Sequence, residues 1–255
     1  MIGRRLAAGG WRIAIAVTLA LPLFAADPAS RQPPAAGPVC DRIVWEVTHG
    51  QYSRALTHLE GAPTSGGSEA SRANLRGIAR MLAGNVKQSL TDFDMALELE
   101  PSMTEARFNR AVAQLKLGEY ARASKDFESI WSDEKSPLRA RAAYHDALAL
   151  DAMQKSSDAE AWLARALEAD PQLDDALFFS GALQERRGDL QGAGRAYKTY
   201  LDRHPQSVGA MLRFGVCAQR AGSIETAKAY LQRVVAAAPE SAEGAEARKF
   251  LVMWE

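Results

Sequence analysis

The chain has 255 residues, of which 47% are hydrophobic, 24% charged and 7% aromatic. Its 31 basic residues balance its 31 acidic residues, so it lacks the basic excess that favours binding to nucleic acid or to an anionic membrane. The composition is that of an ordinary soluble protein, and nucleic acid is not expected as a partner.

The N-terminal residues have the pattern of an export signal. Three arginines, at positions 4, 5 and 12, precede an uncharged apolar stretch from Ile13 to Ala26. This stretch ends in small residues, as signal peptides do before their cleavage site. We expect a signal peptide over 1–26 and a periplasmic or secreted protein. The alternative is an N-terminal membrane anchor, although a stretch of 14 residues is shorter than the ~20 that cross a bilayer. Removing 1–26 leaves 28 basic and 31 acidic residues, a net charge of −3.

A short linker is expected between this signal and the folded part. Residues 27–38 contain four prolines among alanine and serine, a composition that cannot bury a core. We predict a flexible, partly extended tether there.

From residue 39 onward the sequence is organised by an internal repeat. Five prolines are separated by 36, 34, 34 and 34 residues: Pro101, Pro137, Pro171, Pro205 and Pro239. When each proline is counted as position 32 of a 34-residue unit, positions 8 and 20 hold only glycine, alanine or serine, and position 24 holds a large side chain. Small residues facing large ones are what two closely packed helices need. The longer first interval places a two-residue insertion in the loop after Trp131.

Each unit is predicted to be a pair of helices. Position 15, where the first helix must end, is glycine in four of the five units and Gln154 in the other. The proline then ends the second helix. The predicted units are 70–103, 104–139, 140–173, 174–207 and 208–241, preceded by a degenerate unit at 39–69 and followed by a capping helix at 242–255.

The chain resembles the tetratricopeptide repeat (TPR) family, most clearly in residues 108–111, 118–120 and 96–101. The resemblance implies an all-α fold, a right-handed α-solenoid of antiparallel helix pairs with about six units and a C-terminal cap. In such a solenoid Cys40 and Cys217 lie at opposite ends, too far apart for a disulfide. We expect both to be unpaired and mostly buried, with intermolecular pairing through Cys40 as the alternative.

No catalytic constellation is evident in the sequence. None of the four histidines has metal-ligand spacing with a cysteine or another histidine, and no phosphate-binding loop, nucleophile elbow or dinucleotide motif occurs. We therefore predict no enzyme activity, no cofactor and no metal.

The predicted functional surface is the groove that the resemblance assigns to the first helices, at positions 2, 5, 9, 12 and 13 of each unit. An apolar floor with cationic edges suits a peptide that carries acidic side chains or a C-terminal carboxylate. The carboxylate clamp of chaperone-binding family members is matched only by Asn109 and Arg141. The candidate groove residues are Asn74, Ile78, Phe108, Asn109, Val112, Lys116, Arg141, Tyr144, Leu148, Phe178, Arg186, Leu212, Val216 and Arg220.

These features favour a non-enzymatic scaffold of the bacterial cell envelope that binds a protein or peptide partner, with a role in assembling an envelope or secretion complex. Two alternatives are a cofactor-related accessory protein of the cytochrome-maturation type and a self-associating structural protein. The side chains at position 5 suit either packing against the neighbouring unit or direct contact with a ligand, and both interpretations stay open.

Overall fold

The computed structural model describes residues 39–61 and 68–254, and within those ranges the chain forms helices and turns without a strand. The expected signal peptide at 1–26 and linker at 27–38 lie outside the described residues, as does the side chain of Cys40. Cys217 is a free, buried thiol as expected, and burial raises its pKa to about 12.

Twelve of the helices form six consecutive pairs, and the thirteenth follows the last pair. The pairs are α1 (Val39–Thr48) with α2 (Tyr52–Gly61), α3 (Glu69–Leu82) with α4 (Val86–Leu99), α5 (Thr104–Lys116) with α6 (Tyr120–Trp131), α7 (Arg139–Ala152) with α8 (Ser156–Ala169), α9 (Asp174–Arg187) with α10 (Leu190–Arg203), and α11 (Val208–Arg220) with α12 (Ile224–Ala237). The last helix is α13 (Ala242–Val252). The predicted all-α solenoid of helix pairs is confirmed.

The small residues at position 8 allow the two helices of a pair to pack closely. A Cβ atom added to Gly77 on α3 would lie 2.5 Å from Cε1 of Phe93 on α4, far inside van der Waals contact. At the same register position Gly181 meets Tyr197, with a Cβ to Cε1 distance of 2.9 Å. The predicted opposition of small and large side chains therefore holds the helices of each pair together.

The turn inside each pair uses a left-handed backbone residue. Gly118 follows the C-cap of α5 with φ of +78°, and Gln154 occupies the same position after α7 with φ of +64°. Among the described residues Gln154 is the only one other than glycine with a positive φ. The absent glycine therefore does not change the turn, but it places a side chain where glycine is preferred.

From α3 to α13 the connections that follow each pair have four residues except at one place. Four residues separate α4 from α5, whereas seven, residues 132–138, separate α6 from α7. The insertion lies in the loop after Trp131, as the proline spacing predicts. Ser136 and Leu138 in this loop are buried, so the longer connection packs against the solenoid.

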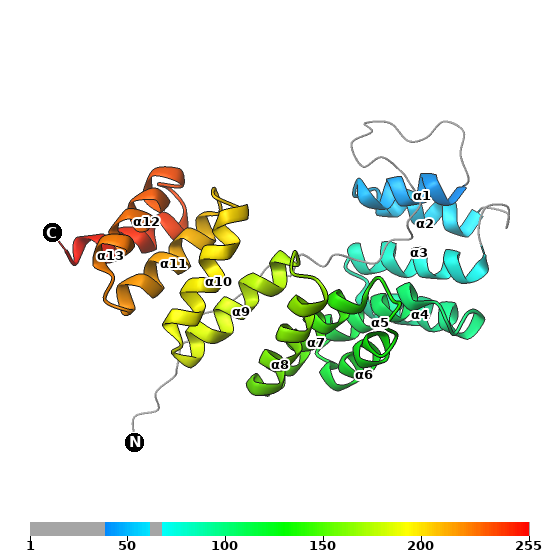
Figure 1. The fold of residues 1–255 in the computed structure, drawn as a ribbon. Coiled ribbons are helices and arrows are strands. Elements are labelled where there is room, and N and C mark those ends of the chain that lie inside the picture. Colours follow the sequence, from blue (N-terminus) through cyan, green and yellow to red (C-terminus); the bar gives the residue numbers. More distant parts are fainter. Residues whose placement is uncertain (1–38, 62–67, 255) are drawn as a thin grey trace, which may run out of the picture.

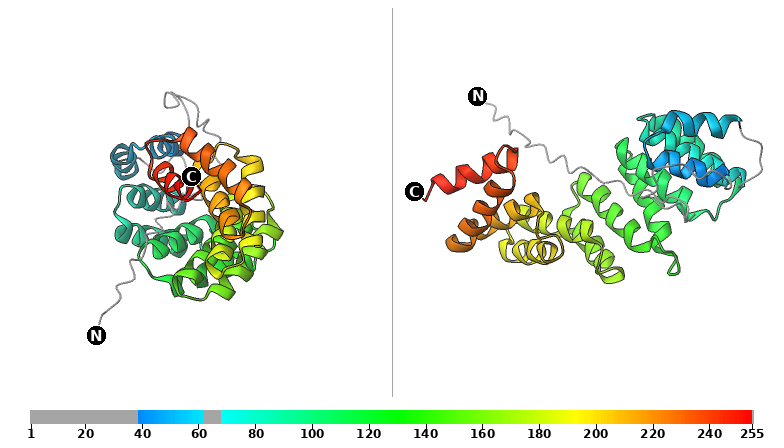
Figure 2. Two further views of the ribbon diagram at one scale, coloured as in Figure 1. Left: turned by 90° about the vertical axis from the view of Figure 1, so that its left-hand side faces the viewer. Right: turned by 90° about the horizontal axis from the view of Figure 1, so that it is seen from above.

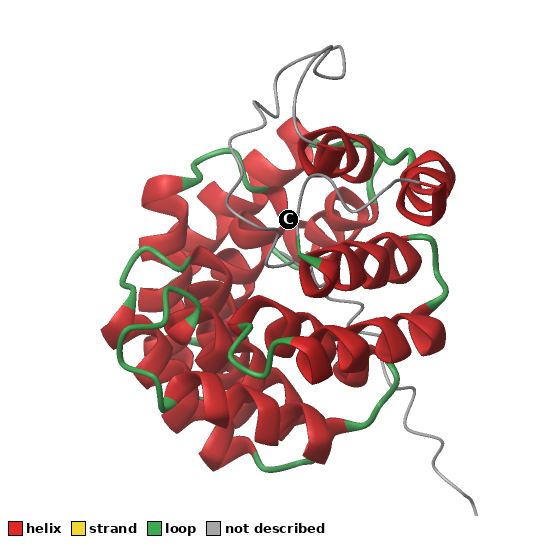
Figure 3. Ribbon diagram, turned by 90° about the vertical axis from the view of Figure 1, so that its right-hand side faces the viewer, coloured by secondary structure: helices red, strands yellow, loops and turns green. Residues whose placement is uncertain are grey.

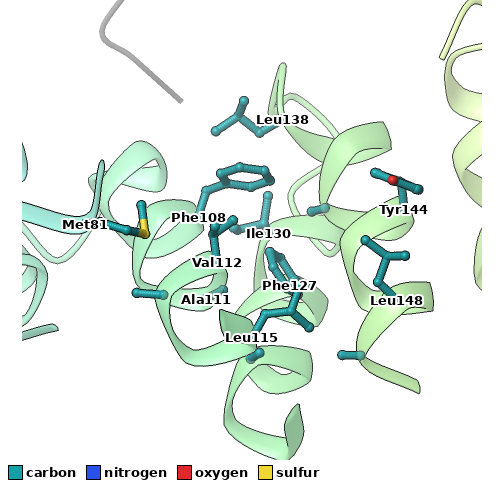
Figure 4. Packing of buried hydrophobic residues seen from close by; sticks show 14 of the residues in the cluster. Met81, Phe108, Ala111, Val112, Leu115, Phe127, Ile130, Leu138, Tyr144 and Leu148 are labelled. Atoms are coloured by element: carbon teal, nitrogen blue, oxygen red, sulfur yellow. The ribbon is translucent and has the colours of Figure 1, made fainter. Parts of the chain in front are cut away.

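The pairs stack into an elongated molecule with α1 near one end and α13 at the other (Figure 1). Viewed along its length, from either end, the stacked helices curve around a common axis (Figures 2 and 3). The largest cluster of buried apolar side chains runs from Ile43 to Leu183, the next from Leu201 to Ala247, and two small clusters accompany them. Part of the largest cluster, with Phe108 and Phe127 from α5 and α6, is shown in Figure 4.

The helix α13 covers the flank of the last pair, as expected of a cap. Its Ala247 is fully buried, and Phe250 and Leu251 pack against the C-terminal apolar cluster. Beyond them Val252 and Met253 are 65% and 67% exposed. The cap thus closes the core of the last pair while its own end carries apolar side chains in solvent.

Candidate functional site

Position 5 of one first helix contacts position 6 of the next first helix along the N-terminal and central solenoid. The Asn109 side-chain amide donates a hydrogen bond to Oδ1 of Asn74 at 3.0 Å in a buried environment. The equivalent pairs are aromatic: Phe108 with His145 at 5.1 Å and Tyr144 with Phe179 at 6.3 Å between ring centroids. These residues join neighbouring units.

The apolar groove floor expected at positions 5 and 9 is largely covered. The members that are fully or almost fully buried are Ile78, Phe108, Val112, Tyr144, Leu148, Leu212 and Val216. Figure 4 shows Phe108 and Val112 within the packed side chains of α5 and α6 rather than standing apart from them. Phe178 differs, because it is only half-buried, with its ring 5.3 Å from those of both Tyr197 and Tyr200.

Two of the expected rim cations are engaged within the solenoid. Arg186 forms an ion pair with Asp151 of the preceding first helix, and Arg220 lies 3.6 Å from the carboxylate of Glu185 in the same register. These pairs link position 12 of one unit to position 13 of the next. Lys116 is exposed and forms no ion pair with any described residue.

Arg141 differs from the other arginines named at the rim. It is half-buried near the start of α7, and its guanidinium lies 5.0 Å from the centroid of the Phe108 ring. The Nη2 atom is buried without a hydrogen-bond partner, and no carboxylate of the described residues lies within ion-pair distance. Burial lowers the pKa of Arg141, which the charge of Asp175 partly offsets. A half-buried guanidinium without an anion is a candidate binding group.

A pocket of about 420 Å³ adjoins this arginine. It is lined by the loop after α6, the start of α7 and the end of α8, including Ser136, Pro137, Arg141 and Asp170. Arg139 also lines the pocket, but its Nε donates to the carbonyl oxygen of Trp131 at 3.1 Å and its guanidinium covers the Trp131 ring. Arg141 is therefore the cation of this pocket that is not already satisfied by the chain.

Two further buried polar residues on α7 were not among the residues predicted from the sequence to be functional. His145 is 1% exposed; its Nδ1 lies 2.9 Å from the carbonyl oxygen of Arg141, and its Nε2 has no partner. Burial lowers the pKa of His145 to about 4. Asp146 is fully buried, and neither carboxylate oxygen accepts a hydrogen bond. The sequence does mark Asp146 as unusual when position 7 of the units is aligned, because the two preceding units have an arginine there, Arg76 and Arg110.

Comparison with family models identifies the repeat. A tetratricopeptide repeat model matches residues 74–131 and 147–208, and a second model with the same description matches residues 185–249. No curated protein sequence matches the chain.

Solved structures show the same fold at low sequence identity. PilW, described as a widely conserved type IV pilus biogenesis factor, has 21% identity and a TM-score of 0.71, covering 79% of this chain and 92% of PilW. PilF of Pseudomonas aeruginosa has 16% identity and a TM-score of 0.71, covering 83% of this chain and 94% of PilF. YrrB, described as a TPR protein with an unusual peptide-binding site, has 19% identity and a TM-score of 0.57, covering 78% of this chain and 97% of YrrB.

In the described ranges no helix is long and apolar enough to span a bilayer. The family models together match more than half of the chain, and the matched segments coincide with the helix pairs. The chain belongs to the tetratricopeptide repeat family, whose members are generally non-catalytic scaffolds for protein interaction.

Proposed function

We propose that this chain is an exported, non-enzymatic scaffold of the bacterial cell envelope that binds a segment of a partner protein along its first helices. An acidic side chain or C-terminal carboxylate of the partner pairs with Arg141. The scaffold acts in the assembly of an envelope complex, and the segment that it holds is extended or helical.

The observation that carries this proposal is the unpaired guanidinium of Arg141. The other groove arginines at 186 and 220 have intramolecular carboxylate partners, whereas Nη2 of Arg141 is buried without an acceptor. A buried donor without a partner is costly, and a carboxylate satisfies an arginine with two parallel hydrogen bonds. A partner's carboxylate therefore gains more binding free energy at Arg141 than at Arg186 or Arg220.

The surroundings of Arg141 extend this anchor into a surface. Lys116 on α5 is an exposed, unpaired cation in the preceding unit, and Phe178 on α9 is the half-buried aromatic residue in the following unit. An acidic segment with one apolar side chain is complementary to the three groups. The export pattern in residues 1–26 and the fold shared with PilW, a type IV pilus biogenesis factor, support a place in the envelope.

The test is photo-crosslinking in intact cells. A photoreactive amino acid in place of Lys116 captures a protein that lies along the first helices, and cell fractionation locates the product. We expect one major crosslinked protein in the envelope or periplasmic fraction, and Arg141→Gln reduces its yield about tenfold, the effect of losing a charge-assisted pair.

Arg186→Gln is the matched control, because it removes a cation of the same type that already has an intramolecular partner. It is expected to leave the crosslink unchanged. The same yield in Arg141→Gln as in the unsubstituted protein removes Arg141 from the proposal, and a product confined to the cytoplasm removes the envelope role.

A further inference from the structure

A second candidate binding group lies on another face of α7, and the neighbouring unit provides the template for it. In the α5/α6 unit, Arg110 occupies position 7 and donates to Asp126 of α6 at 2.8 Å from both Nε and Nη2. Its Nη1 also donates to Asp94 on the preceding second helix, α4, at 3.0 Å. One guanidinium thus neutralises two carboxylates from two second helices.

The α7/α8 unit has the reverse charge at this position. Asp146 replaces the arginine, and the residue in register with Asp94 is Glu128 on α6. The position of Asp126 is taken by Trp162 on α8. The three positions that hold a guanidinium and two carboxylates in one unit therefore hold two carboxylates and an aromatic ring in the next.

Asp146 receives little compensation from the chain itself. It is 0% exposed, and both of its oxygens lack a hydrogen-bond partner. Burial raises the pKa of Asp146. The Ser124 hydroxyl is near enough to lower this pKa but does not meet hydrogen-bond geometry, the charge of Arg165 also lowers this pKa, and the negative charge of Glu128 raises it. An unpaired buried carboxylate is among the most costly groups that a protein can hold, so it calls for a cation or a proton.

A groove is formed by residues of α6, α7 and α8 next to Asp146 in the fold. We call it the α6–α8 groove; it has a volume of about 360 Å³ and its lining includes Ser124, Glu128, Leu150, Asp158, Trp162 and Arg165. Asp146 does not itself line the groove, but three residues that do, Ser124, Glu128 and Arg165, act on its carboxylate.

Trp162 supplies the aromatic surface of the groove. Its ring meets that of Trp131 edge-on at 5.6 Å, and the guanidinium of Arg165 lies 4.6 Å from its centroid. Arg165 is exposed and forms no ion pair with any described residue, so it is free to move away from the ring. The cation that now covers the Trp162 ring is thus weakly held, and Lys155 is the other cation of the lining.

We propose that the α6–α8 groove binds an arginine side chain of a partner protein, with the guanidinium between Asp146 and Glu128 and against the Trp162 ring. It takes the place in this unit that Arg110 has in the preceding one and displaces Arg165. Arginine is the matching group because its planar fork bonds two carboxylates and stacks on an aromatic face. This site is distinct from Arg141 and takes a ligand of the opposite charge.

The binding test uses the purified protein and N-acetyl-arginine amide as the probe, with N-acetyl-citrulline amide as its neutral isostere. The readout is the indole N–H signal of Trp162 in a nitrogen-15 NMR spectrum, assigned by Trp162→Phe. We expect a saturable shift with the arginine compound and at least about tenfold weaker binding of the citrulline compound, because the charge-assisted bonds are lost.

Variants decide whether Asp146 is responsible. Asp146→Asn is expected to weaken binding of the arginine compound about tenfold and Glu128→Gln several-fold. The matched control is Asp158→Asn, which removes an exposed carboxylate of the same groove that does not act on Asp146. It should leave the affinity within about twofold, as a solvent-screened charge does.

Equal binding of the two probes, or unchanged affinity in Asp146→Asn, overturns the proposal. Circular dichroism checks that the Asp146→Asn variant is folded. We expect it to fold, because the substitution removes an unpaired charge. Arg141→Gln should not alter the Trp162 shift. A negative result at this groove can therefore be distinguished from a negative result at the anion site of Arg141.

Discussion

The α5/α6 and α7/α8 units share a backbone and differ in how their polar positions are completed. Asn109 at position 6 of α5 is hydrogen-bonded to Asn74, and Arg110 at position 7 is bonded to two carboxylates. One unit later these positions hold His145 and Asp146, each with buried atoms that lack a partner.

Comparison of the two units separates the positions that the fold requires from those that it leaves free. The close approach of the paired helices and the left-handed turn recur in both units, because without them the helices could not pack. The charges at positions 6 and 7 are not required by the backbone. Where they are left unpaired, as on α7, the unit carries a cost in stability that binding of a partner would offset.

Removing the guanidinium from the satisfied unit is expected to have the largest effect. Arg110→Leu leaves Asp126, which is 9% exposed, and Asp94 without their shared cation. We expect the free energy of unfolding to fall by about 3 kcal/mol, the cost of leaving a largely buried carboxylate unpaired. Urea denaturation followed by circular dichroism measures it.

The control for this substitution is Arg186→Leu, which breaks a pair whose arginine is 57% exposed. It should cost less than about 1 kcal/mol, because solvent screens such a pair. Equal losses in the two variants would mean that the Arg110 cluster is no more than a surface ion pair.

Removing the charge of Asp146 is expected to raise the free energy of unfolding, and the size of this gain depends on pH. Burial raises the pKa of Asp146 to about 6, above the value of about 3.9 expected in the unfolded chain. The folded protein therefore holds the proton more tightly, and stability falls as pH rises from about 4 to 6. Asp146→Asn removes this loss, so the variant should gain about 2 kcal/mol relative to the original protein between pH 4 and 7.

The measurement is the difference between the unfolding free energies of the two proteins across that pH range. His145 titrates in the opposite sense: its lowered pKa, about 4, makes the folded state lose stability as pH falls below about 6.5. Both proteins keep His145, so its contribution cancels in the difference. A difference that does not change with pH would show that Asp146 is ionised equally in the folded and unfolded states.

Sequence periodicity was sufficient to predict the fold because the small residue at Gly77, the large one at Phe93 and the prolines recur at one interval. It was not sufficient at position 5, where an aromatic side chain fits either a groove or a joint between units. Phe108 is buried by the next first helix, a contact that depends on the superhelical approach of α5 and α7. Asp146 was detectable by aligning position 7, but its lack of a partner required the structure.

The smallest expected effect concerns the turn that both units share. Gln154→Gly should raise the free energy of unfolding by about 0.5 to 1 kcal/mol, since glycine adopts a positive φ without the steric cost of a Cβ. The side chain of Gln154 is exposed and makes no hydrogen bond in the described structure, so its removal should lose little else.

The reciprocal substitution, Gly118→Gln, should lower the free energy of unfolding by a similar amount. A Cβ atom at Gly118 would come no closer than 3.9 Å to its neighbours, so the expected cost lies in the backbone and not in a clash. Thermal or urea unfolding of the two variants provides the comparison. If Gly118→Gln is costly but Gln154→Gly brings no gain, the glutamine stabilises its turn in a way that the backbone does not account for. The α7/α8 unit would then differ from its neighbour in its turn as well as in its charges.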